Sequence, residues 1–460
     1  MSSADRREFI ASMGSWAAAV ALSAFHARTV RGEKTRGPGY GPLRPTADET
    51  TGWELLRLPE GFRYRSFGWT GDPLECGTPT PGLHDGMAAF AGENGRVLLI
   101  RNHEINADGG SFAKPELTYD PKGPGGCTTL EFDGKRGEWV RAWCAISGTS
   151  RNCAGGSTPW GTWLTCEETH LGPGGVYEGK KMTFEKTHGW IFEVPPDGAH
   201  HPQPLEDMGR FVHEAIAVDP TTDIVYETED RVASGFFRFL PNTRKKLAAG
   251  GRLEMMKVKG HSDLRTGVDP AKIYDVQWVP IDDPTKVAGN DTEDQGVYHQ
   301  GKSQGGVTFA RLEGCWHSPL DGRIYFDATS GGDQKRGQIW SYDPREEQLR
   351  LIYESPGQEV LDMPDNICVS PQGAIMLCED GFISPHRLHG LTLDGKLFTF
   401  AENNIDFRTG SKPPQIAAED YRAQEWAGVT FSPDGKWLFV NAQTPGVTFA
   451  ITGPWAEGNL

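Results

Sequence analysis

The chain has 460 residues, a length that would allow two or three domains, and its 58 Gly and 32 Pro favour many turns over long helices. Its formal net charge is −16 at pH 7, which disfavours nucleic acid or an anionic membrane surface as a partner. The acidic excess is compatible with a protein that gathers cations and also with an ordinary solvated surface.

The N-terminus predicts an export signal. Arg6 and Arg7 precede a mildly apolar stretch, residues 11–25, and this order is typical of a twin-arginine signal peptide. The stretch is short, Ala-rich and interrupted by Ser, so we expect no stable membrane insertion. We expect residues 1–27 to be read by the twin-arginine export machinery and the mature protein to be a periplasmic or secreted monomer. An ordinary basic N-terminus is the alternative.

One pattern recurs along the rest of the chain: an apolar strand, a turn and a second apolar strand. In the clearest copy the turn is Pro433, Asp434 and Gly435, where Pro presets φ, Asp bonds its own backbone and Gly takes a positive φ. Two apolar runs around such a turn predict a β-hairpin. The six copies are residues 84–104, 153–168, 212–230, 311–329, 364–380 and 426–443.

The repeat predicts one large domain. Repeats of several tens of residues, each contributing a few strands, are typical of propeller blades. We therefore expect residues 51–460 to form an all-β, six-bladed β-propeller with a central metal-lined channel and loop insertions, the longest at residues 241–300. Residues 28–50, rich in Arg, Gly and Pro, predict a linker or a strap across the surface.

Each hairpin opens and closes on a polar residue. In an antiparallel hairpin these two positions lie at the same end, so a ring of six copies would direct about twelve polar groups to one place. Clustered carboxylates repel one another unless they bind cations or share protons, which predicts a metal site in the channel. The opening residues are Asp85, Cys153, Glu214, Glu313, Asp365 and Glu425, and the closing residues are Glu104, Glu168, Asp230, Asp327, Asp380 and Asn441.

Two residues qualify the chemistry of this site. Cys153 stands where the other copies have an acid, and a thiolate among carboxylates favours a transition metal such as iron, whereas oxygen ligands alone favour Ca²⁺. A small buried cysteine is the alternative. Arg311 lies two residues before Glu313, so both side chains leave the same face of a strand, and a guanidinium there would clamp a phosphate or carboxylate. A structural salt bridge is the alternative.

The eight cysteines include no Cys-x-x-Cys, which disfavours a zinc knuckle, and their pairing cannot be assigned.

Several stretches resemble the PhoX-type alkaline phosphatase family. The resemblance covers the chain from about residue 50 to the end and is carried by residues 152–168, 209–214, 226–230, 311–314, 378–380 and 431–455. It implies a six-bladed propeller with Fe³⁺ and Ca²⁺ in its channel that hydrolyses small-molecule phosphate monoesters.

Carried over residue by residue, the resemblance implies a catalytic, phosphate-binding role for Arg311. The metal ligands it implies are Cys153, Glu168, Glu214, Glu313, Glu379 and Asp380, and further candidates are Glu104, Asp230 and Asn102.

The sequence departs from the family in one segment. Residues 128–150 are shorter than the segment with which the family's phosphatases help to build the substrate site, which indicates a shorter, divergent branch. Metal binding therefore carries over better than phosphatase activity. The alternatives are a calcium-dependent propeller hydrolase of another ester class, such as a lactone or phosphotriester, and a non-catalytic propeller stabilised by metal.

Overall fold

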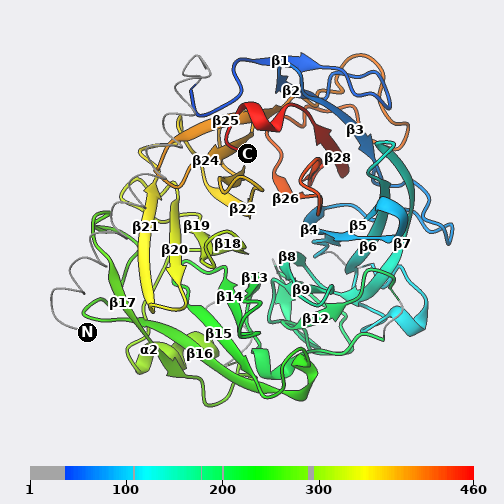
Figure 1. Cartoon of the computed structure of the whole chain (residues 1–460). Helices are drawn as coiled ribbons and strands as arrows, with labels where there is room; N and C mark the ends of the chain where they lie inside the picture. The colour runs from blue at the N-terminus through cyan, green and yellow to red at the C-terminus, as the bar shows by residue number, and fades with distance from the viewer. Residues whose placement is uncertain (1–36, 107–108, 178, 199–200, 288–294) are drawn as a thin grey trace, which may run out of the picture.

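The structure is a computed structural model that describes residues 37–106, 109–177, 179–198, 201–287 and 295–460. The predicted signal peptide, residues 1–27, lies outside the described residues, as does the first part of the predicted strap. The regular structure of the described chain is mostly strand, arranged as a β-propeller-like ring of sheets (Figure 1).

The ring consists of five sheets. The first two in chain order are β4–β5–β6–β7 (His84–Ala91, Arg96–His103, Gly125–Asp133, Glu138–Thr149) and β8–β9–β12 (Asn152–Ser157, Trp163–Glu167, Ile191–Val194). Next is the nine-stranded sheet β13–β14–β15–β16–β17–β21–β20–β19–β18 (His213–Val218, Val225–Glu229, Phe236–Pro241, Gly251–Val258, Tyr274–Pro280, Gln348–Glu354, Gln338–Asp343, Ile324–Ala328, Leu312–His317). The last two are β22–β23–β24–β25–β2–β1 (Pro364–Val369, Ile375–Glu379, Arg387–Leu391, Leu397–Asn403, Leu56–Pro59, Leu43–Thr46) and β26–β27–β28–β3 (Trp426–Phe431, Leu438–Ala442, Val447–Thr452, Arg63–Phe67).

Few other elements are present in the described residues. A small hairpin pairs β10 (Val176–Tyr177) with β11 (Lys180–Lys181), and the α-helix α2 covers Gly296–Ser303. Short 3-10 helices cover Glu93–Gly95, Pro115–Leu117, Glu206–Met208, Leu247–Ala249 and Trp455–Glu457.

All six predicted hairpins are present as antiparallel pairs: β4–β5, β8–β9, β13–β14, β18–β19, β22–β23 and β26–β27. Their first strands pack side by side around the channel in chain order, and β26 packs against β4 to close the ring (Figure 1). The polar ends of the hairpins therefore meet at the centre, as the repeat predicted.

Strands from the start of the chain complete two neighbouring sheets. β3 pairs with β28, so residues from both ends of the chain share one sheet, and β1 and β2 extend the adjacent sheet beyond β25. The insertion at residues 241–300 contributes β17, which pairs with β16 on one side and β21 on the other. This pairing, which the sequence did not predict, merges two hairpin sheets into the nine-stranded one.

Every hairpin has the same irregularity near the start of its first strand. The pairing register shifts after the first aligned pair in five hairpins and after the second in β26–β27, leaving two residues opposite one, which is the pattern of a β-bulge. A bulge redirects a side chain, and the first residue inside it is an opening residue of the repeat in five of six copies. These bulge residues are Asp85, Cys153, Glu214, Glu313 and Asp365, with Gly428 in the sixth copy.

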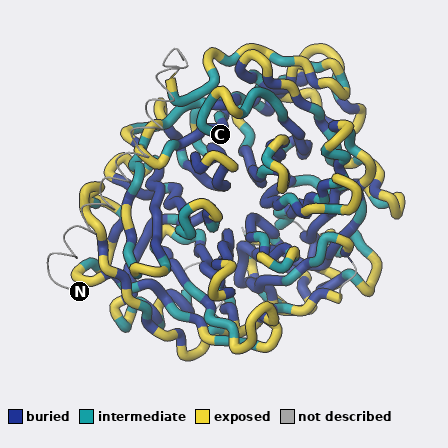
Figure 2. The backbone as a smooth tube through the Cα atoms, viewed as in Figure 1, coloured by how far each residue is buried: buried dark blue, intermediate teal, exposed yellow. Residues whose placement is uncertain are grey.

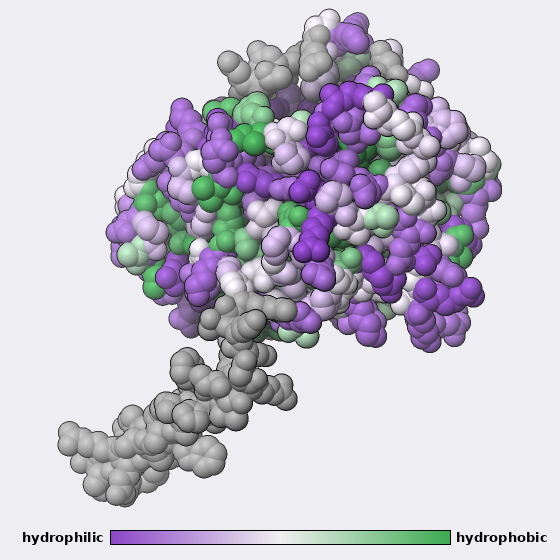
Figure 3. Space-filling model, turned by 90° about the horizontal axis from the view of Figure 1, so that it is seen from above, coloured by the Kyte–Doolittle hydropathy of each residue, from purple (hydrophilic) through white to green (hydrophobic). Residues whose placement is uncertain are grey.

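Buried residues concentrate on the strands, and exposed residues on the loops at the circumference (Figure 2). One side of the ring is covered mostly by hydrophilic residues with hydrophobic ones scattered among them (Figure 3). Among the described residues, no helix has the length and apolarity that a membrane crossing requires.

The bulge of the sixth hairpin requires glycine. Gly428 has φ +65°, and a Cβ there would lie 2.5 Å from the carbonyl oxygen of Asp85 and 2.6 Å from Nδ2 of Asn441. We expect Gly428→Ala to lower the free energy of unfolding by about 3 kcal/mol, because it adds both a clash and backbone strain. Gly410→Ala is the control, since its φ is +86° but no atom lies within 4 Å, and it should cost only about 1 kcal/mol. Equal losses in urea titrations would show that the close contact is unimportant.

Candidate metal centre and phosphate site

The end of each hairpin is held by a repeated backbone contact. The N–H of the first residue after the second strand donates to the carbonyl of the residue before the first strand, as in Glu104 to Leu83, Glu168 to Arg151 and Asp380 to Met363. The same contact joins Asp230 to Val212 and Thr329 to Arg311. Positive φ values, a strained conformation for residues other than Gly and one that recurs at functional sites, occur at Leu83, Arg151, Arg311 and Met363.

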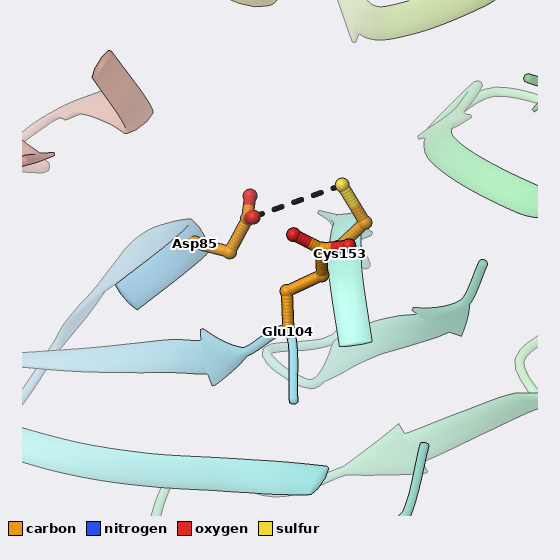
Figure 4. A group of neighbouring side chains, drawn as sticks. All are labelled: Asp85, Glu104 and Cys153. Atoms are coloured by element: carbon orange, nitrogen blue, oxygen red, sulfur yellow. Dashed lines mark hydrogen bonds between the residues drawn. The ribbon is translucent and has the colours of Figure 1, made fainter. Parts of the chain in front are cut away.

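Three groups of side chains converge inside this ring. Asp85, Glu104 and Cys153 form the first group, in which Cys153 Sγ lies 3.7 Å from Asp85 Oδ2 (Figure 4). Cys153 also belongs to the second group, with Glu168 and Glu214. Within each group the candidate ligand atoms lie within 4.8 Å of one another. The third group contains Asp365, Asp380 and Glu425.

Gln443 connects the first and third groups. Its Nε2 lies 3.1 Å from Asp85 Oδ2, 3.0 Å from Glu104 Oε2 and 2.7 Å from Glu425 Oε2. The last hairpin extends one pair further than the others, so that Glu425 and Gln443 face each other across it. In this hairpin the first bulge residue is Gly428, which has no side chain, and Asn441 lies within the second strand. Glu425 and Gln443 therefore supply the polar pair at the end of the hairpin.

Two arginines enter the same ring from equivalent positions. Arg311 Nη2 lies 2.6 Å from Glu313 Oε1, and its Nε lies 3.0 Å from Asp230 Oδ1. Arg151 bridges Glu104 and Glu168 in the same manner. The Arg311 side chain is 30 % exposed, against 19 % for Arg151 and 3 % for Glu313, so Arg311 is the more accessible of the two arginines.

Burial and mutual repulsion make the carboxylates costly to ionise together. Burial first, and then the neighbouring carboxylates, raise the pKa well above the ordinary value for Asp85, Glu168, Glu214, Glu313, Asp365 and Glu425. Burial also raises the pKa of the Cys153 thiol, and it raises that of Asp380 to about 6 although Arg311 opposes the shift. Oε1 of Glu214 is buried and has no hydrogen-bond partner among the described residues. Such a set of groups is suited to divalent or trivalent cations, which would replace the shared protons.

Only some of the predicted metal ligands belong to the three groups of side chains. Cys153, Glu168 and Glu214 lie together, with Glu104 beside Cys153. Asp380 lies in the third group, and Glu313 lies between Arg311 and Asp365. Asp230 binds Arg311.

Glu379 lies outside the three groups. Both of its oxygens accept hydrogen bonds from Arg387, and Oε1 also accepts from the N–H of Asp362 and contacts His389 at 2.9 Å. Burial opposes ionisation of Glu379, but His389 and Arg387 outweigh it and lower the pKa to about 2. Adjacent residues on a strand point to opposite faces, so Asp380 faces the channel while Glu379 holds its own sheet together.

Two other polar residues have structural contacts. Asn102 donates to the carbonyls of Cys153 and Ala154 and accepts from Trp163 Nε1, so it positions the backbone at Cys153. Asp327 accepts the N–H of Gly314 and belongs to none of the three groups.

The ring also contains residues that are not among the candidate ligands predicted from the sequence. Arg151 could have been found because it stands two residues before Cys153, as Arg311 does before Glu313. Asp85, Asp365 and Glu425 were recognised as opening residues, and the repeat alone was sufficient to include them. Gln443 had no such signal, because its place depends on the extra pair in the last hairpin.

The fold and the site together define a β-propeller-like protein whose channel is acidic and carries arginines. Within that class, the chain belongs to the PhoX alkaline phosphatase family, since the family model "Alkaline phosphatase PhoX" matches residues 38–142 and 140–446. The match confirms the resemblance and the enzyme class expected from it, a phosphoric monoester hydrolase. No curated protein matches the chain in sequence.

Solved structures agree on the fold. Pseudomonas fluorescens PhoX in complex with vanadate, a transition state analogue, superposes with a TM-score of 0.67 and 18% identity, covering 92% of this chain and 99% of that chain. A gluconolactonase from Xanthomonas campestris superposes with a TM-score of 0.42 and 12% identity, covering 91% of this chain and 99% of that one. The first likeness shows a shared fold, and the second is too low to support an argument.

The different surroundings of Glu214 and Glu379 can be tested by substitution. We expect Glu214→Gln to lower the amount of bound metal without destabilising the metal-free protein, because it removes a candidate ligand whose Oε1 has no hydrogen-bond partner to lose. Glu379→Gln should retain the metal but lower the free energy of unfolding by about 3 kcal/mol, since it leaves buried cationic partners unpaired. Mass spectrometry of metals and chelator-treated thermal unfolding measure both effects. Loss of metal in Glu379→Gln, with stability unchanged, would make Glu379 a ligand after all.

A buried charged histidine beside the site predicts pH-dependent stability. His188 Nδ1 lies 2.6 Å from Glu167 and Nε2 lies 3.3 Å from Asp120; burial opposes its charging, but the two carboxylates outweigh burial and raise its pKa to about 9. Relative to an ordinary value of 6.5, this shift stabilises the fold by about 3 kcal/mol below pH 6.5, and the effect is lost as the pH rises through 9. We expect the stability gap between wild type and His188→Gln to close over that range in urea titrations. A gap that does not change with pH would show that His188 is neutral when folded.

Proposed function

We propose that the chain is an exported, metal-dependent phosphatase that hydrolyses phosphomonoesters in the channel of a six-bladed propeller. In this interpretation the nine-stranded sheet counts as two blades joined by β17. The observation that supports it best is the convergence of three groups of acids, with a shared thiol, around a partly exposed Arg311. Family membership supports the reaction class.

The donor set fits Fe³⁺ and Ca²⁺. Cys153 is shared by two groups, so the thiolate and the carboxylates of Glu168 and Glu214 would hold iron, while the all-oxygen group with Asp365 and Asp380 suits calcium. The buried Oε1 of Glu214, which has no hydrogen-bond partner among the described residues, supports a cation at this group. When bound, the metals would polarise the phosphoryl oxygens and stabilise the leaving oxygen.

The protein's own residues bind and orient the ester. The guanidinium of Arg311 presents a planar fork suited to two phosphoryl oxygens. Asp230 and Glu313 fix its direction through two separate ion pairs. Because these donors are oriented before the ester arrives, little reorganisation is needed as charge develops on the phosphoryl group.

The first experiment is to isolate the protein from a host with twin-arginine export, measure its metal content by mass spectrometry and assay the hydrolysis of p-nitrophenyl phosphate. We expect the wild type in the exported fraction, with iron, calcium and turnover, and Arg6→Lys with Arg7→Lys retained in the cytoplasm. Loss of turnover on chelation and recovery on adding both metals would support the metal dependence. Calcium without iron and no turnover of any phosphomonoester would contradict the proposal and direct attention to lactones, phosphotriesters or binding.

Arg311 tests the phosphate site separately from the metals. We expect Arg311→Lys to lower kcat/KM by about 10²-fold, because a point charge replaces a bidentate fork, and Arg311→Ala to lower it by about 10³-fold. Metal content should be unchanged in both variants. Arg265→Lys, at an exposed ion pair with Asp263, is the control and should behave as wild type. Unchanged kinetics for Arg311→Ala would leave the residue with a structural role only.

A further inference from the structure

Two strongly exposed apolar side chains lie on loops that begin at the channel acids. Val232 is 72% exposed and follows Asp230 by two residues, and Phe382 is 75% exposed and follows Asp380 by two residues. They are the two most exposed large apolar side chains in the described chain. Single exposed apolar residues are ordinary, but the same position after a channel acid in two loops calls for an explanation.

Both loops are close to Arg311 along the backbone and around the ring. The N–H of Arg311 donates to the carbonyl of Arg231, the residue before Val232, over 2.8 Å. Arg311 immediately precedes β18, and the first strands of the hairpins that lead into the two loops, β13 for Val232 and β22 for Phe382, are the neighbours of β18 in the ring. The loops that carry the two side chains are therefore neighbours of Arg311 in the ring.

Phe382 is held rigidly although it is exposed. Oδ2 of Asp362 accepts the N–H of Phe382 at 2.6 Å and that of Ile383 at 3.1 Å. Oδ1 of Asp362 binds Arg336, whose guanidinium lies 5.4 Å from the Phe382 ring centre. The N–H of Asp362 in turn donates to Glu379. These hydrogen bonds fix the backbone that carries the exposed ring, so the position of Phe382 is defined although its side chain is not packed into the core.

We propose that Phe382 and Val232 bind the organic part of the phosphate ester, so that the enzyme selects esters with an aromatic or bulky apolar leaving group. The inference rests on the proposed function and specifies its substrate class. With the phosphoryl group at Arg311, a leaving group directed toward solvent would be in a position to contact the Phe382 ring, beside which the Arg336 guanidinium lies. A small polar leaving group gains nothing there.

The test compares two substrates on metal-loaded protein, phenyl phosphate and glycerol 2-phosphate. We expect Phe382→Ala to lower kcat/KM for phenyl phosphate about tenfold, mainly through KM, and to leave glycerol 2-phosphate within twofold, since apolar contact is lost only with the aromatic ester. Val232→Ala should have the same sign with a smaller effect, and Phe382→Trp should retain the preference. The control is Leu393→Ala, because Leu393 is 49% exposed at the opposite end of the same sheet and should affect neither substrate.

The outcomes distinguish a failure of the proposed substrate selection from a failure of the proposed phosphatase function. An equal loss for both substrates would make Phe382 a structural residue, and no loss for either would remove it from the site; each result overturns the inference while the phosphatase function stands. Failure of the wild type to hydrolyse either ester would contradict the proposed function itself. Thermal unfolding and metal content of each variant identify any loss that comes from misfolding, in which case Phe382→Leu replaces Phe382→Ala.

A second inference concerns two cysteines on the outer part of the ring. Sγ of Cys76 lies 3.9 Å from Sγ of Cys144, and the N–H of Glu75 donates to the carbonyl of Ala142, which holds the loop against β7. Cys76 is exposed and Cys144 is buried, whereas the other six cysteines are all buried. The sulfurs would have to approach from 3.9 Å to the length of a disulfide bond, about 2 Å, and the position of Cys76 in a surface loop favours that movement.

We infer that Cys76 and Cys144 form a disulfide when the protein meets an oxidant of the low-molecular-weight disulfide class. The Cys76 thiolate attacks the oxidant and expels one thiol, and the Cys144 thiolate then attacks Cys76 Sγ and expels the second. Two protein thiols are oxidised and one small disulfide is reduced to two thiols. A hydrogen bond from Thr78 lowers the pKa of Cys76, which suits it to the first step.

The test incubates the full chain with oxidised glutathione, alkylates the remaining thiols after denaturation and maps the peptides. We expect a Cys76–Cys144 linked peptide, six alkylated cysteines and a higher melting temperature than that of the reduced protein. Cys144→Ser should instead retain glutathione on Cys76, because the resolving thiol is missing. Wild type that keeps glutathione on Cys76, or that keeps eight free thiols, would overturn the inference.

Discussion

The structure depends on holding together side chains that repel one another. At least six buried carboxyl groups around the channel have pKa values raised by burial and by their neighbours. No short segment could impose this arrangement, because a flexible chain would separate the charges. The ring of sheets does so because each acid is anchored at the end of a hairpin whose body is packed into the hydrophobic core. The free energy gained by burying apolar side chains in the sheets thus offsets the repulsion between the buried carboxyl groups at the centre.

Strand geometry divides the polar residues into two kinds. In three hairpins the last strand residue is a glutamate that binds the loop or strands of its own sheet: Glu167, Glu229 and Glu379. The next residue faces the channel, as Glu168, Asp230 and Asp380 do. Two adjacent acids in the sequence therefore have different surroundings, one among the acids at the centre of the ring and one hydrogen-bonded within its own sheet.

Much of this could be predicted from the repeat. The six hairpins, their common orientation and the convergence of their polar ends followed from the spacing of apolar runs and turns, and Cys153, Glu168 and Glu214 were found by that argument. The position of Glu379 was harder to predict. In a pair of adjacent acids such as Glu379 and Asp380, the sequence does not show which side chain points to the centre, because this depends on the register that the bulge sets. The link made by β17 and the extra pair at Glu425 and Gln443 depend on tertiary pairing between distant segments, for which a single sequence holds no local signal.

The sheet that combines β3 with β26, β27 and β28 has a consequence for how the site comes into being. Synthesis delivers β3 early and β28 almost last, so the ring stays open until nearly the whole chain has left the ribosome. Glu425 and Gln443 belong to that final hairpin, and Gln443 joins two of the three acid groups. The third acid group and its link to the first are therefore completed only when the C-terminal hairpin is in place, and a chain that stops short of that hairpin retains most of its strands but lacks both Glu425 and the Gln443 link.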